Sequence, residues 1–282
     1  MDPTMDPAIG RVRFDVAKAA WLWTMIGVGV VGVMTATWTA IAIACALHVV
    51  TLCVGHSVGL HRGVIHRAYR AGPVTRGALA YLAVLTGLGG PLTWARLHAV
   101  RDYWQCQSAC PAYFRYQHSL ARDFLWYLHC RFEPSDRRAE QRLPPDLLCD
   151  PWLGFLERTW PLHVLALAIA ITATLGSAAA ATIIGTRTAL GFLGHWFIGF
   201  AAHRWGTRRF SIACASESGT NVWLLGVLSF GEGFHNNHHR YPASARMGLR
   251  WYELDLGYGV IRVLAALRLI HDVRLPQPWT LT

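Results

Sequence analysis

The sequence predicts an all-α integral membrane protein with four transmembrane helices and a cytoplasmic helical cap that carries a His-rich metal site. The first observation is composition, since 53% of the 282 residues are hydrophobic and only 15% are charged, which is too apolar for an ordinary soluble domain. The second is that charged residues are spaced to leave apolar runs long enough to cross a bilayer. The third is the stretch GEGFHNNHHRYP, residues 231–242, which holds three histidines within five residues. We expect residues 1–282 to form a single domain.

Charge and cysteine content argue against two other classes of protein. The net charge of +10 comes from 25 arginines and a single lysine, Lys18. In a membrane protein such an excess marks the loops that stay in the cytoplasm, so we predict no nucleic-acid binding. The seven cysteines include no CxxC motif and predict no disulfide framework, which is typical of a reducing compartment. The preference for arginine over lysine favours a bacterial source, and we expect the bacterial inner membrane.

The first apolar region predicts two membrane helices. Residues 1–18 are polar, and we expect them to be loose rather than a cleavable signal, because the apolar run that follows is too long. No Lys, Arg, Asp or Glu occurs between Lys18 and Arg62, a run of over forty residues. About twenty residues are enough for one membrane helix. The region therefore predicts a helical hairpin with spans near 17–36 and 38–58.

The second apolar region begins near Trp160 and is interrupted only by Arg187. We predict two further spans, near 160–178 and 188–203, with Arg187 at the turn between them. Basic residues precede the first span, lie between the second and third, and follow the fourth. Because cytoplasmic loops carry this excess, both termini are predicted to be cytoplasmic, which agrees with an even number of spans.

The remaining segments predict a cap on the cytoplasmic face. Residues 77–93 are apolar but short and contain Gly-Gly-Pro, which favours an interfacial or re-entrant helix over a full span. Residues 119–132 mix aromatic and charged side chains, as in a helix at headgroup level. Residues 133–151 are charged and rich in proline and predict a loop. Residues 251–274 predict an amphipathic helix that covers the cytoplasmic face.

The histidines of residues 231–242 have the spacing of a metal site. His235, His238 and His239 lie at positions i, i+3 and i+4, which share one face of a helix, so we expect their imidazoles to converge on one point. A set made only of imidazoles suits zinc, copper, iron or nickel rather than magnesium or calcium. The alternative is a His-rich polar turn at the surface, and the choice depends on whether other segments bring ligands to the same place.

Four further histidines fall at the same predicted membrane face. His61 and His66 end the second span in GLHRGVIHR, and His98 follows the re-entrant segment in WARLHAVRDYW. His203 closes the fourth span in GFAAHRWG. Seven histidines from four segments at one face are hard to explain as independent structural residues, and they predict a shared metal site.

With these motifs the chain resembles the membrane fatty acyl desaturases, especially the acyl-CoA (stearoyl-CoA type) branch. GLHRGVIHR resembles the first histidine box of that family, HxxxxH, and GEGFHNNHHRYP resembles the third box with its Gly-Glu-x-Phe lead. AAHRWGTRRF resembles the end of the family's fourth helix, where a further metal-binding histidine maps onto His203. The resemblance covers about residues 20–260 and implies the same four-span topology.

The chain departs from the family pattern at the second box, HxxHH, which here has the residues His98-Ala-Val-Arg101-Asp102. The family's asparagine four residues before the further histidine is replaced by Gly199. Seven of the nine histidine ligands that the resemblance implies are therefore present, and one metal has fewer protein ligands. Asp102 is a candidate metal ligand, because carboxylates serve iron well. Arg101 is a poor neighbour for a dication unless it turns away or pairs with Asp102.

Several other polar residues are candidates for supporting roles. Glu232, Asn236 and Asn237 are candidate cofactor-site groups that orient the histidine rings, with turn formation as the alternative for the two asparagines. His118 is a candidate extra ligand, with a polar residue at headgroup level as the plainer interpretation. His56 lies one turn deeper in the second span, and we expect it to support packing or the metal ligands.

The resemblance implies that all seven histidines are catalytic ligands of two iron ions, a non-haem di-iron centre that uses O2. Such centres remove hydrogens from an unactivated methylene of an acyl chain, while the protein positions that chain in an apolar tunnel. The implied substrate is acyl-CoA or an acyl-lipid among the membrane lipids. No haem-attachment motif, iron–sulfur cysteine set or nucleotide fingerprint occurs. Electrons are therefore expected from a separate protein, a ferredoxin or a b-type cytochrome with its reductase.

Two alternatives stay open on the sequence alone. A lipid or hydrocarbon hydroxylase of the same fold would add an oxygen to the chain rather than a double bond. A non-catalytic relative, whose second box no longer holds two irons, would bind lipid or a partner protein. Product analysis separates the first alternative from a desaturase, and the iron content of the chain tests the second.

Overall fold

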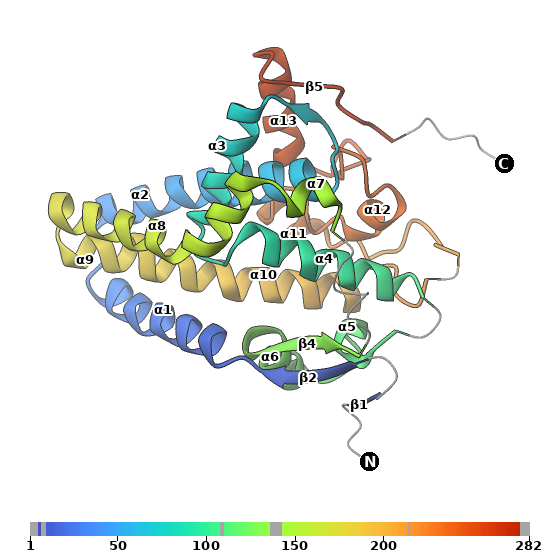
Figure 1. Ribbon diagram of the computed structural model, residues 1–282, viewed down its shortest axis with the longest axis horizontal. Coiled ribbons are helices and arrows are strands. Elements are labelled where there is room, and N and C mark those ends of the chain that lie inside the picture. Colours follow the sequence, from blue (N-terminus) through green and yellow to red (C-terminus); the bar gives the residue numbers. More distant parts are fainter. Residues whose placement is uncertain (1–4, 7–9, 108–109, 136–142, 214, 277–282) are drawn as a thin grey trace.

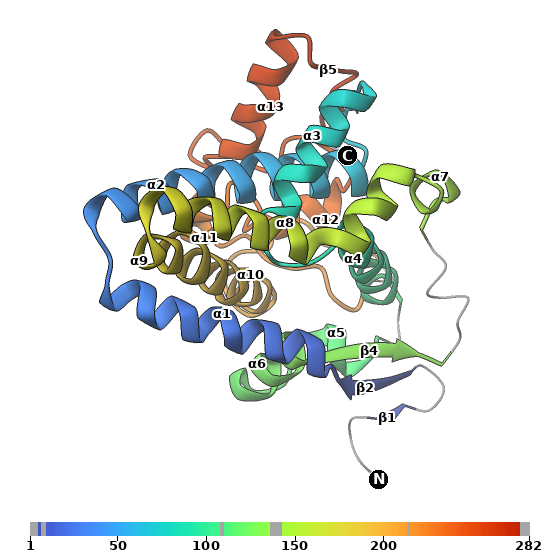
Figure 2. The ribbon, with the colours of Figure 1, turned by 60° about the vertical axis from the view of Figure 1, so that its left-hand side comes forward.

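Four helical rods run side by side through the computed structural model of the protein, which describes residues 5–6, 10–107, 110–135, 143–213 and 215–276 (Figures 1 and 2). The first rod is α1 (Val16–Met34), and the third is α8 (Pro151–Leu175). The second rod joins α2 (Trp38–His48) to the π-helix η1 (Val49–Ile65). The fourth rod joins α9 (Ser177–Ala180), the π-helix η3 (Ala181–Thr186) and α10 (Arg187–Arg204).

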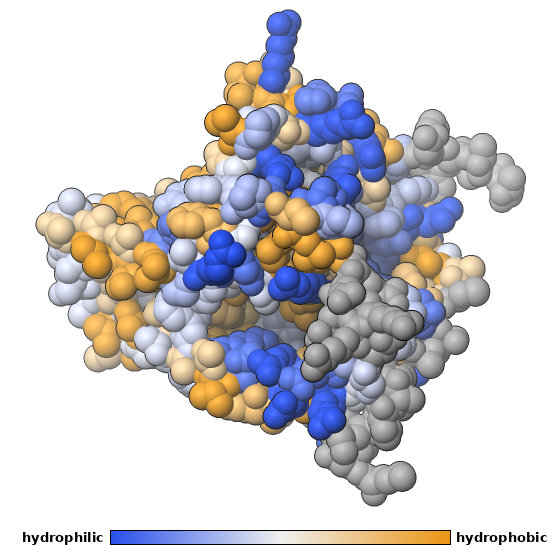
Figure 3. Space-filling view, in the orientation of Figure 1, coloured by the Kyte–Doolittle hydropathy of each residue, from blue (hydrophilic) through white to orange (hydrophobic). Residues whose placement is uncertain are grey.

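Three helices, Val16–Met34, Trp38–Ile65 and Pro151–Leu175, are long and apolar enough to cross a membrane. Their outward faces carry large exposed hydrophobic residues, such as Val33 on α1 and Leu162 on α8, and extended apolar surface of this kind marks contact with lipid or another protein. Figure 3 shows hydrophobic surface at the end of the bundle where α2, α8 and α9 meet, whereas charged residues gather over the middle. The chain is therefore a membrane protein, and the fourth span within residues 177–204 stays a prediction.

The turn between the third and fourth rods lies at Gly176 rather than at Arg187, so the predicted position was wrong. Gly176 adopts a positive φ of 87° at the corner, a conformation that favours glycine. Arg187 is instead buried inside the bundle. Its guanidinium donates to Thr51 Oγ1 at 2.9 Å and to the Leu85 carbonyl at 2.8 Å. A charged side chain can remain in an apolar bundle when its donors are satisfied there, and a linear charge pattern does not show those partners.

The first rod packs closely on the fourth because both present small residues. A Cβ added to Gly32 would lie 2.5 Å from the Ala181 carbonyl oxygen, and one added to Gly29 would lie 3.2 Å from Thr186. A hydroxyl also crosses between the helices, since Thr182 Oγ1 donates to the Gly32 carbonyl at 2.8 Å. Small residues and interhelical hydrogen bonds are common means of helix association in membranes.

We expect Gly32→Val to weaken this contact, because the added side chain must push two helix backbones apart. Overpacking of this kind costs about 1–3 kcal/mol and should lower the unfolding temperature of the detergent-solubilised protein. Gly27→Val on the same helix is the matched control, since a Cβ at Gly27 meets nothing within 4 Å. Equal unfolding temperatures for the two variants would contradict the close packing of α1 on η3.

The remaining helices gather around one end of the rods, away from α9 (Figures 1 and 2). They are α3 (Pro73–Val84), α4 (Pro91–Gln105), α5 (Ala112–Arg115), α6 (Leu120–His129), α7 (Pro145–Leu148), α11 (Trp223–Leu228), α12 (His235–Arg240) and α13 (Leu256–Ala266). The predicted interfacial segment 77–93 divides between α3, which packs along η1, and the start of α4. The predicted helix 119–132 ends at His129, and segment 251–274 contains α13. Of the predicted loop 133–151, residues 136–142 lie outside the described part.

Two small antiparallel sheets, which the all-α prediction missed, complete the fold. β1 (Met5–Asp6), β2 (Gly10–Phe14) and β4 (Cys130–Pro134) form one sheet in the order β1-β2-β4. β3 (Arg70–Ala71) pairs with β5 (Ile270–His271). Residues 10–14, expected to be loose, are therefore ordered. Strands this short carry too little alternation to be recognised from sequence, and the pairs β2–β4 and β3–β5 join segments that lie far apart in the chain.

Candidate metal centre

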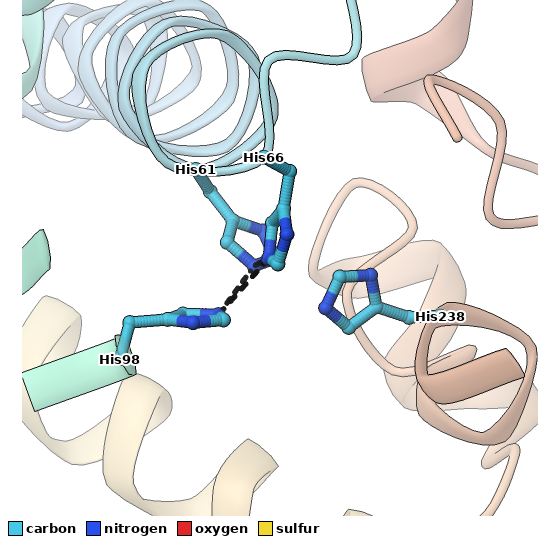
Figure 4. A group of neighbouring side chains, drawn as sticks. All are labelled: His61, His66, His98 and His238. Carbon is cyan, nitrogen blue, oxygen red and sulfur yellow. Dashed lines mark hydrogen bonds between the residues drawn. The ribbon is translucent and has the colours of Figure 1, made fainter. Parts of the chain in front are cut away.

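Four histidines from three helical segments converge where the second rod ends. His61 and His66 come from the end of η1, His98 from α4 and His238 from α12 (Figure 4). His61 Nε2 lies 2.9 Å from His98 Nε2 and 3.2 Å from His66 Nε2. An ion that binds imidazole nitrogens at about 2.1 Å places neighbouring nitrogens about 3.0–3.4 Å apart. We call these residues the four-histidine cluster.

The π-helical geometry of η1 brings His61 and His66 together. They are five positions apart, which is about 1.4 turns of an α-helix and would place them on different faces. In η1 the backbone follows the wider i→i+5 hydrogen-bond pattern, and the His66 N–H donates to the His61 carbonyl at 3.0 Å. Both rings therefore point to the same side, as Figure 4 shows.

A second group of three histidines lies beside the first. His235 and His239 are four residues apart on α12, with their Nε2 atoms 3.0 Å apart. His203, at the end of α10, completes this three-histidine cluster, with its ring centroid 4.9 Å from that of His235. The prediction that the three imidazoles of α12 converge on one point was wrong. His238 and His239 project about 100° apart around the helix, so His238 joins the four-histidine cluster.

Both clusters have the donor chemistry of a metal site. Burial lowers the pKa of His98 to about 4 and that of His239 to about 3, so these imidazoles are neutral at physiological pH, the form that binds a metal. His203 is buried, and neither ring nitrogen has a hydrogen-bond partner within the described residues. Glu217 Oε2 lies 3.6 Å from His203 Nδ1, beyond ordinary hydrogen-bond distance. A metal ion would give His203 the partner that a buried polar group normally has.

Glu232 contacts His61 on the Nδ1 side of the ring, opposite the Nε2 atom that faces the cluster. Its Oε2 accepts from His61 Nδ1 at 2.7 Å, and its Oε1 accepts from Ser57 Oγ at 2.5 Å. Although burial raises the pKa of Glu232, the neighbouring His61 and Arg62 hold it below its usual range, so the carboxylate is ionised. A carboxylate on Nδ1 fixes the tautomer whose Nε2 is free for a metal. Glu232 therefore has the contacts of a ring-orienting residue, and that role stays a prediction.

Arg62, which follows the first histidine of the HxxxxH box, connects η1 to the residues on either side of α12. Its side chain is fully buried and donates to the Ala245 and Phe230 carbonyls at 2.8 and 2.9 Å. It also pairs with Asp255 at 2.9 Å, and Asp255 accepts from the Met247 N–H at 2.7 Å. A buried ion pair of this kind can specify geometry more than it adds stability. Sequence reasoning missed Asp255, although it is one of few acidic residues in the C-terminal part.

The second box places a carboxylate and a guanidinium beside His98. Asp102, a candidate ligand from sequence, belongs to neither cluster. Its Oδ2 accepts from His98 Nδ1 at 3.0 Å, so it contacts His98 from behind as Glu232 contacts His61. Arg101 Nη2 lies 3.3 Å from Asp102 and 3.0 Å from His98 Nε2. The guanidinium thus pairs with Asp102 without turning away from the histidines.

The two asparagines of α12 contact groups around that helix rather than histidine rings within the described residues. Asn236 Oδ1 accepts from the Phe210 N–H at 2.8 Å. Asn237 Nδ2 donates to the Met247 carbonyl at 2.8 Å, and its Oδ1 accepts from Asn221 Nδ2 at 2.8 Å. These bonds anchor a helix of six residues and so position its histidines through the backbone.

His56 and His118 belong to neither cluster. His118 Nε2 hydrogen-bonds with Asp123 Oδ2 at 2.8 Å, so it does not fill the gap left by the second box. The His56 ring packs edge-on against Trp94 and His195, with centroids 5.1 and 5.2 Å away. These contacts agree with the packing role expected for His56.

A cavity of about 310 Å³ lies between the second and fourth rods and the helices α4, α6 and α11, and it reaches both clusters. Its wall includes His61 and His98 of the four-histidine cluster and His235 of the three-histidine cluster. Much of the remaining wall is apolar or aromatic, including Leu52, Ile65, Trp94, Phe197, Ile198, Leu225 and Leu228. A largely apolar cavity with a few convergent polar groups is the usual form of a ligand site, and this one suits a long hydrocarbon chain.

Comparison with known proteins agrees with the motifs and the site. The model of the family described as fatty acid desaturase matches residues 36–271, a range that includes all seven clustered histidines. The chain is 32% identical over 245 residues to a chloroplastic palmitoyl-monogalactosyldiacylglycerol delta-7 desaturase of Arabidopsis thaliana, covering 85% of the chain and 63% of that relative.

The chain covers a larger share of the length of two further relatives. It is 28% identical over 248 residues to an acyl-CoA C20 Delta5-desaturase of Anemone leveillei, covering 86% of the chain and 76% of the relative. It is also 28% identical over 242 residues to an sn-2 palmitoyl-lipid 9-desaturase of Nostoc sp. (strain 36), covering 86% of the chain and 84% of the relative.

Proposed function

Since the chain belongs to the fatty acid desaturase family, it is an oxidoreductase that acts on fatty acyl chains, and we propose that it introduces a double bond into the acyl chain of a membrane lipid or of acyl-CoA. The observation that carries this proposal is the convergence of seven histidines on two clusters beside an apolar cavity. The relatives' names include both lipid-linked and CoA-linked acyl substrates, so the carrier is left to experiment.

We propose that the four-histidine cluster holds one iron ion and the three-histidine cluster a second. Imidazole suits iron among other transition metals, and bound iron supplies the dioxygen chemistry that no amino-acid side chain can supply. The chain itself supplies neutral imidazoles, the carboxylates of Glu232 and Asp102 behind them, and a cavity that positions the acyl chain. Electrons are proposed to come from a separate ferredoxin or b-type cytochrome with its reductase.

We further propose that residues 177–204 form the fourth span and that both termini and both clusters face the cytoplasm of a bacterial inner membrane. Basic residues precede the first span and follow the second and fourth spans. Such an excess marks the loops that stay in the cytoplasm. Mapping of the C-terminus with reporter fusions tests this orientation, and a periplasmic C-terminus would reject it.

The wild-type chain is tested by expression in a bacterial host that supplies a suitable reductase, followed by gas chromatography of total fatty acids. We expect an unsaturated fatty acid that is absent from the same host with an empty vector. An unchanged profile would count against desaturation, and a hydroxylated product would identify a hydroxylase instead. A chain that carries no iron after anaerobic purification would identify a non-catalytic relative.

Gly194 on α10 is a position at which a substitution can narrow the cavity without changing a histidine. It lines the cavity, and a Cβ added there meets nothing within 4 Å. We expect Gly194→Leu to occupy part of the cavity and to lower conversion of the longest acyl chains about tenfold or more, because a misplaced chain loses its reactive position. The measurement is the ratio of long to short unsaturated products. Gly27→Leu on α1 is the control, and an identical ratio in both variants would contradict the assignment of the cavity.

A further inference from the structure

The seven histidines are divided unequally between the two clusters. η1, α4 and α12 all contribute to the four-histidine cluster, whereas the three-histidine cluster draws on α10 and α12 alone. α4 therefore contributes His98 to one site and no histidine to the other. The position one turn after His98 on the same helix face holds Arg101. The side chain that could have served the second site is thus a cation.

Arg101 lies between the two clusters. Its Nη2 is 3.0 Å from His98 Nε2, the nitrogen that faces the rest of the four-histidine cluster. It also lies close enough to Tyr116 for its charge to act on that phenol. The Tyr116 ring lies flat against His203 of the three-histidine cluster, with centroids 4.3 Å apart and planes 6° apart. The Arg101 side chain is only 15% exposed, so solvent screens its charge little.

The guanidinium contacts His98 directly, but the two sites differ in how its charge is compensated. Arg101 stays protonated and has no lone pair, so it cannot bind a metal, and its charge repels a dication. The four-histidine cluster offsets this charge through Asp102 and Glu232, which accept from its rings at 3.0 and 2.7 Å. The corresponding carboxylate of the three-histidine cluster, Glu217, is 3.6 Å from the ring of His203.

We propose that the metal centre is asymmetric: the four-histidine cluster retains its ion, whereas the three-histidine cluster, with Arg101 beside it, exchanges its ion readily. The inference rests on the proposed function, because it assumes that both clusters bind iron. At zinc sites, four protein ligands are typical of closed structural sites, and three are typical of sites that keep a position for water or substrate; the two clusters differ in ligand number in the same way. The second box of this chain therefore defines which of its two sites is open.

The test is the release of iron from the full-length, detergent-solubilised protein after anaerobic loading with ferrous iron. An excess of a ferrous chelator gives an absorbance trace that counts the ions released with time. We expect two phases of equal amplitude for the wild type, with rates that differ about tenfold or more. Arg101→His, which removes the charge and adds a ligand, should slow the fast phase toward the slow one. Arg101→Lys keeps the charge and is the matched control, and Arg101→Gln should be intermediate.

Two ligand variants assign the phases to the clusters. His239→Ala should remove the fast phase and leave the slow one, and His66→Ala should remove the slow phase. Release of both ions at one rate in the wild type, or unchanged phases in both Arg101→His and Arg101→Gln, would overturn the asymmetry. A chain that takes up no iron would reject the proposed function instead, so the two failures are distinguishable. Elution of each variant as wild type on gel filtration confirms that it is folded.

Discussion

Replacing His238 by alanine is expected to lower unsaturated product by about a hundredfold or more, since even the loss of a residue that supports a metal ligand costs about 10–100-fold. His238 is the ring that α12 contributes to the four-histidine cluster. It is buried, and its Nδ1 has no hydrogen-bond partner within the described residues. Its loss therefore removes a proposed metal ligand while breaking no hydrogen bond of that nitrogen, so the fold should survive.

The measurement for His238→Ala combines the fatty-acid profile with iron content per chain. Both should fall together, because the four-histidine cluster would keep three ligands and lose its contact with α12. His271→Ala is the matched control, since this histidine is exposed on β5 and belongs to neither cluster. Normal product from His238→Ala, at the protein level of the control, would refute the assignment of the cluster as the reactive centre.

We expect Glu232→Gln to lower iron affinity or product formation by about 10–100-fold. Glu232 accepts two hydrogen bonds, one from His61 Nδ1 and one from Ser57 Oγ. A glutamine can still accept from His61 Nδ1 and donate to Ser57 Oγ, whose hydroxyl can also accept, but it carries no negative charge, so it holds the His61 tautomer less strongly. The substitution also leaves the buried Arg62 with less compensating charge, since Arg62 Nε lies 3.6 Å from Glu232.

The effect of Glu232→Gln is read by titrating iron into the metal-free protein and by the yield of unsaturated fatty acid. Glu133→Gln on β4 is the control for loss of a carboxylate, because Glu133 forms a surface ion pair with Arg13 at 3.3 Å. Such surface pairs contribute about 0–1 kcal/mol, so this variant should behave as wild type. Wild-type iron affinity in Glu232→Gln would show that the carboxylate is not needed to orient His61.

Local sequence was sufficient to predict the membrane class, the hairpin of the first two helices and the seven histidines. An apolar run with no charge between Lys18 and Arg62 can only be accommodated by lipid or by a large core. The run is long enough for two membrane helices, and the structure has two there, Val16–Met34 and Trp38–Ile65. The histidine spacings are equally local, since each box lies within a few residues. These features depend on composition and helix period, which neighbouring residues determine by themselves.

Three-dimensional packing decided how those histidines are shared. The spacing predicts that the three histidines of residues 231–242 converge on one point. Instead η1, α4, α10 and α12 meet so that His238 joins one group of four rings, while His235 and His239 join a second group of three. It also decided that Asp102 contacts His98 from behind and that Arg187 continues a helix instead of ending it. Each outcome depends on the angle and register between helices distant in the chain, set by contacts such as Arg62 with Asp255. A local pattern cannot specify such contacts, because the direction of a side chain relative to another helix exists only once both helices are packed.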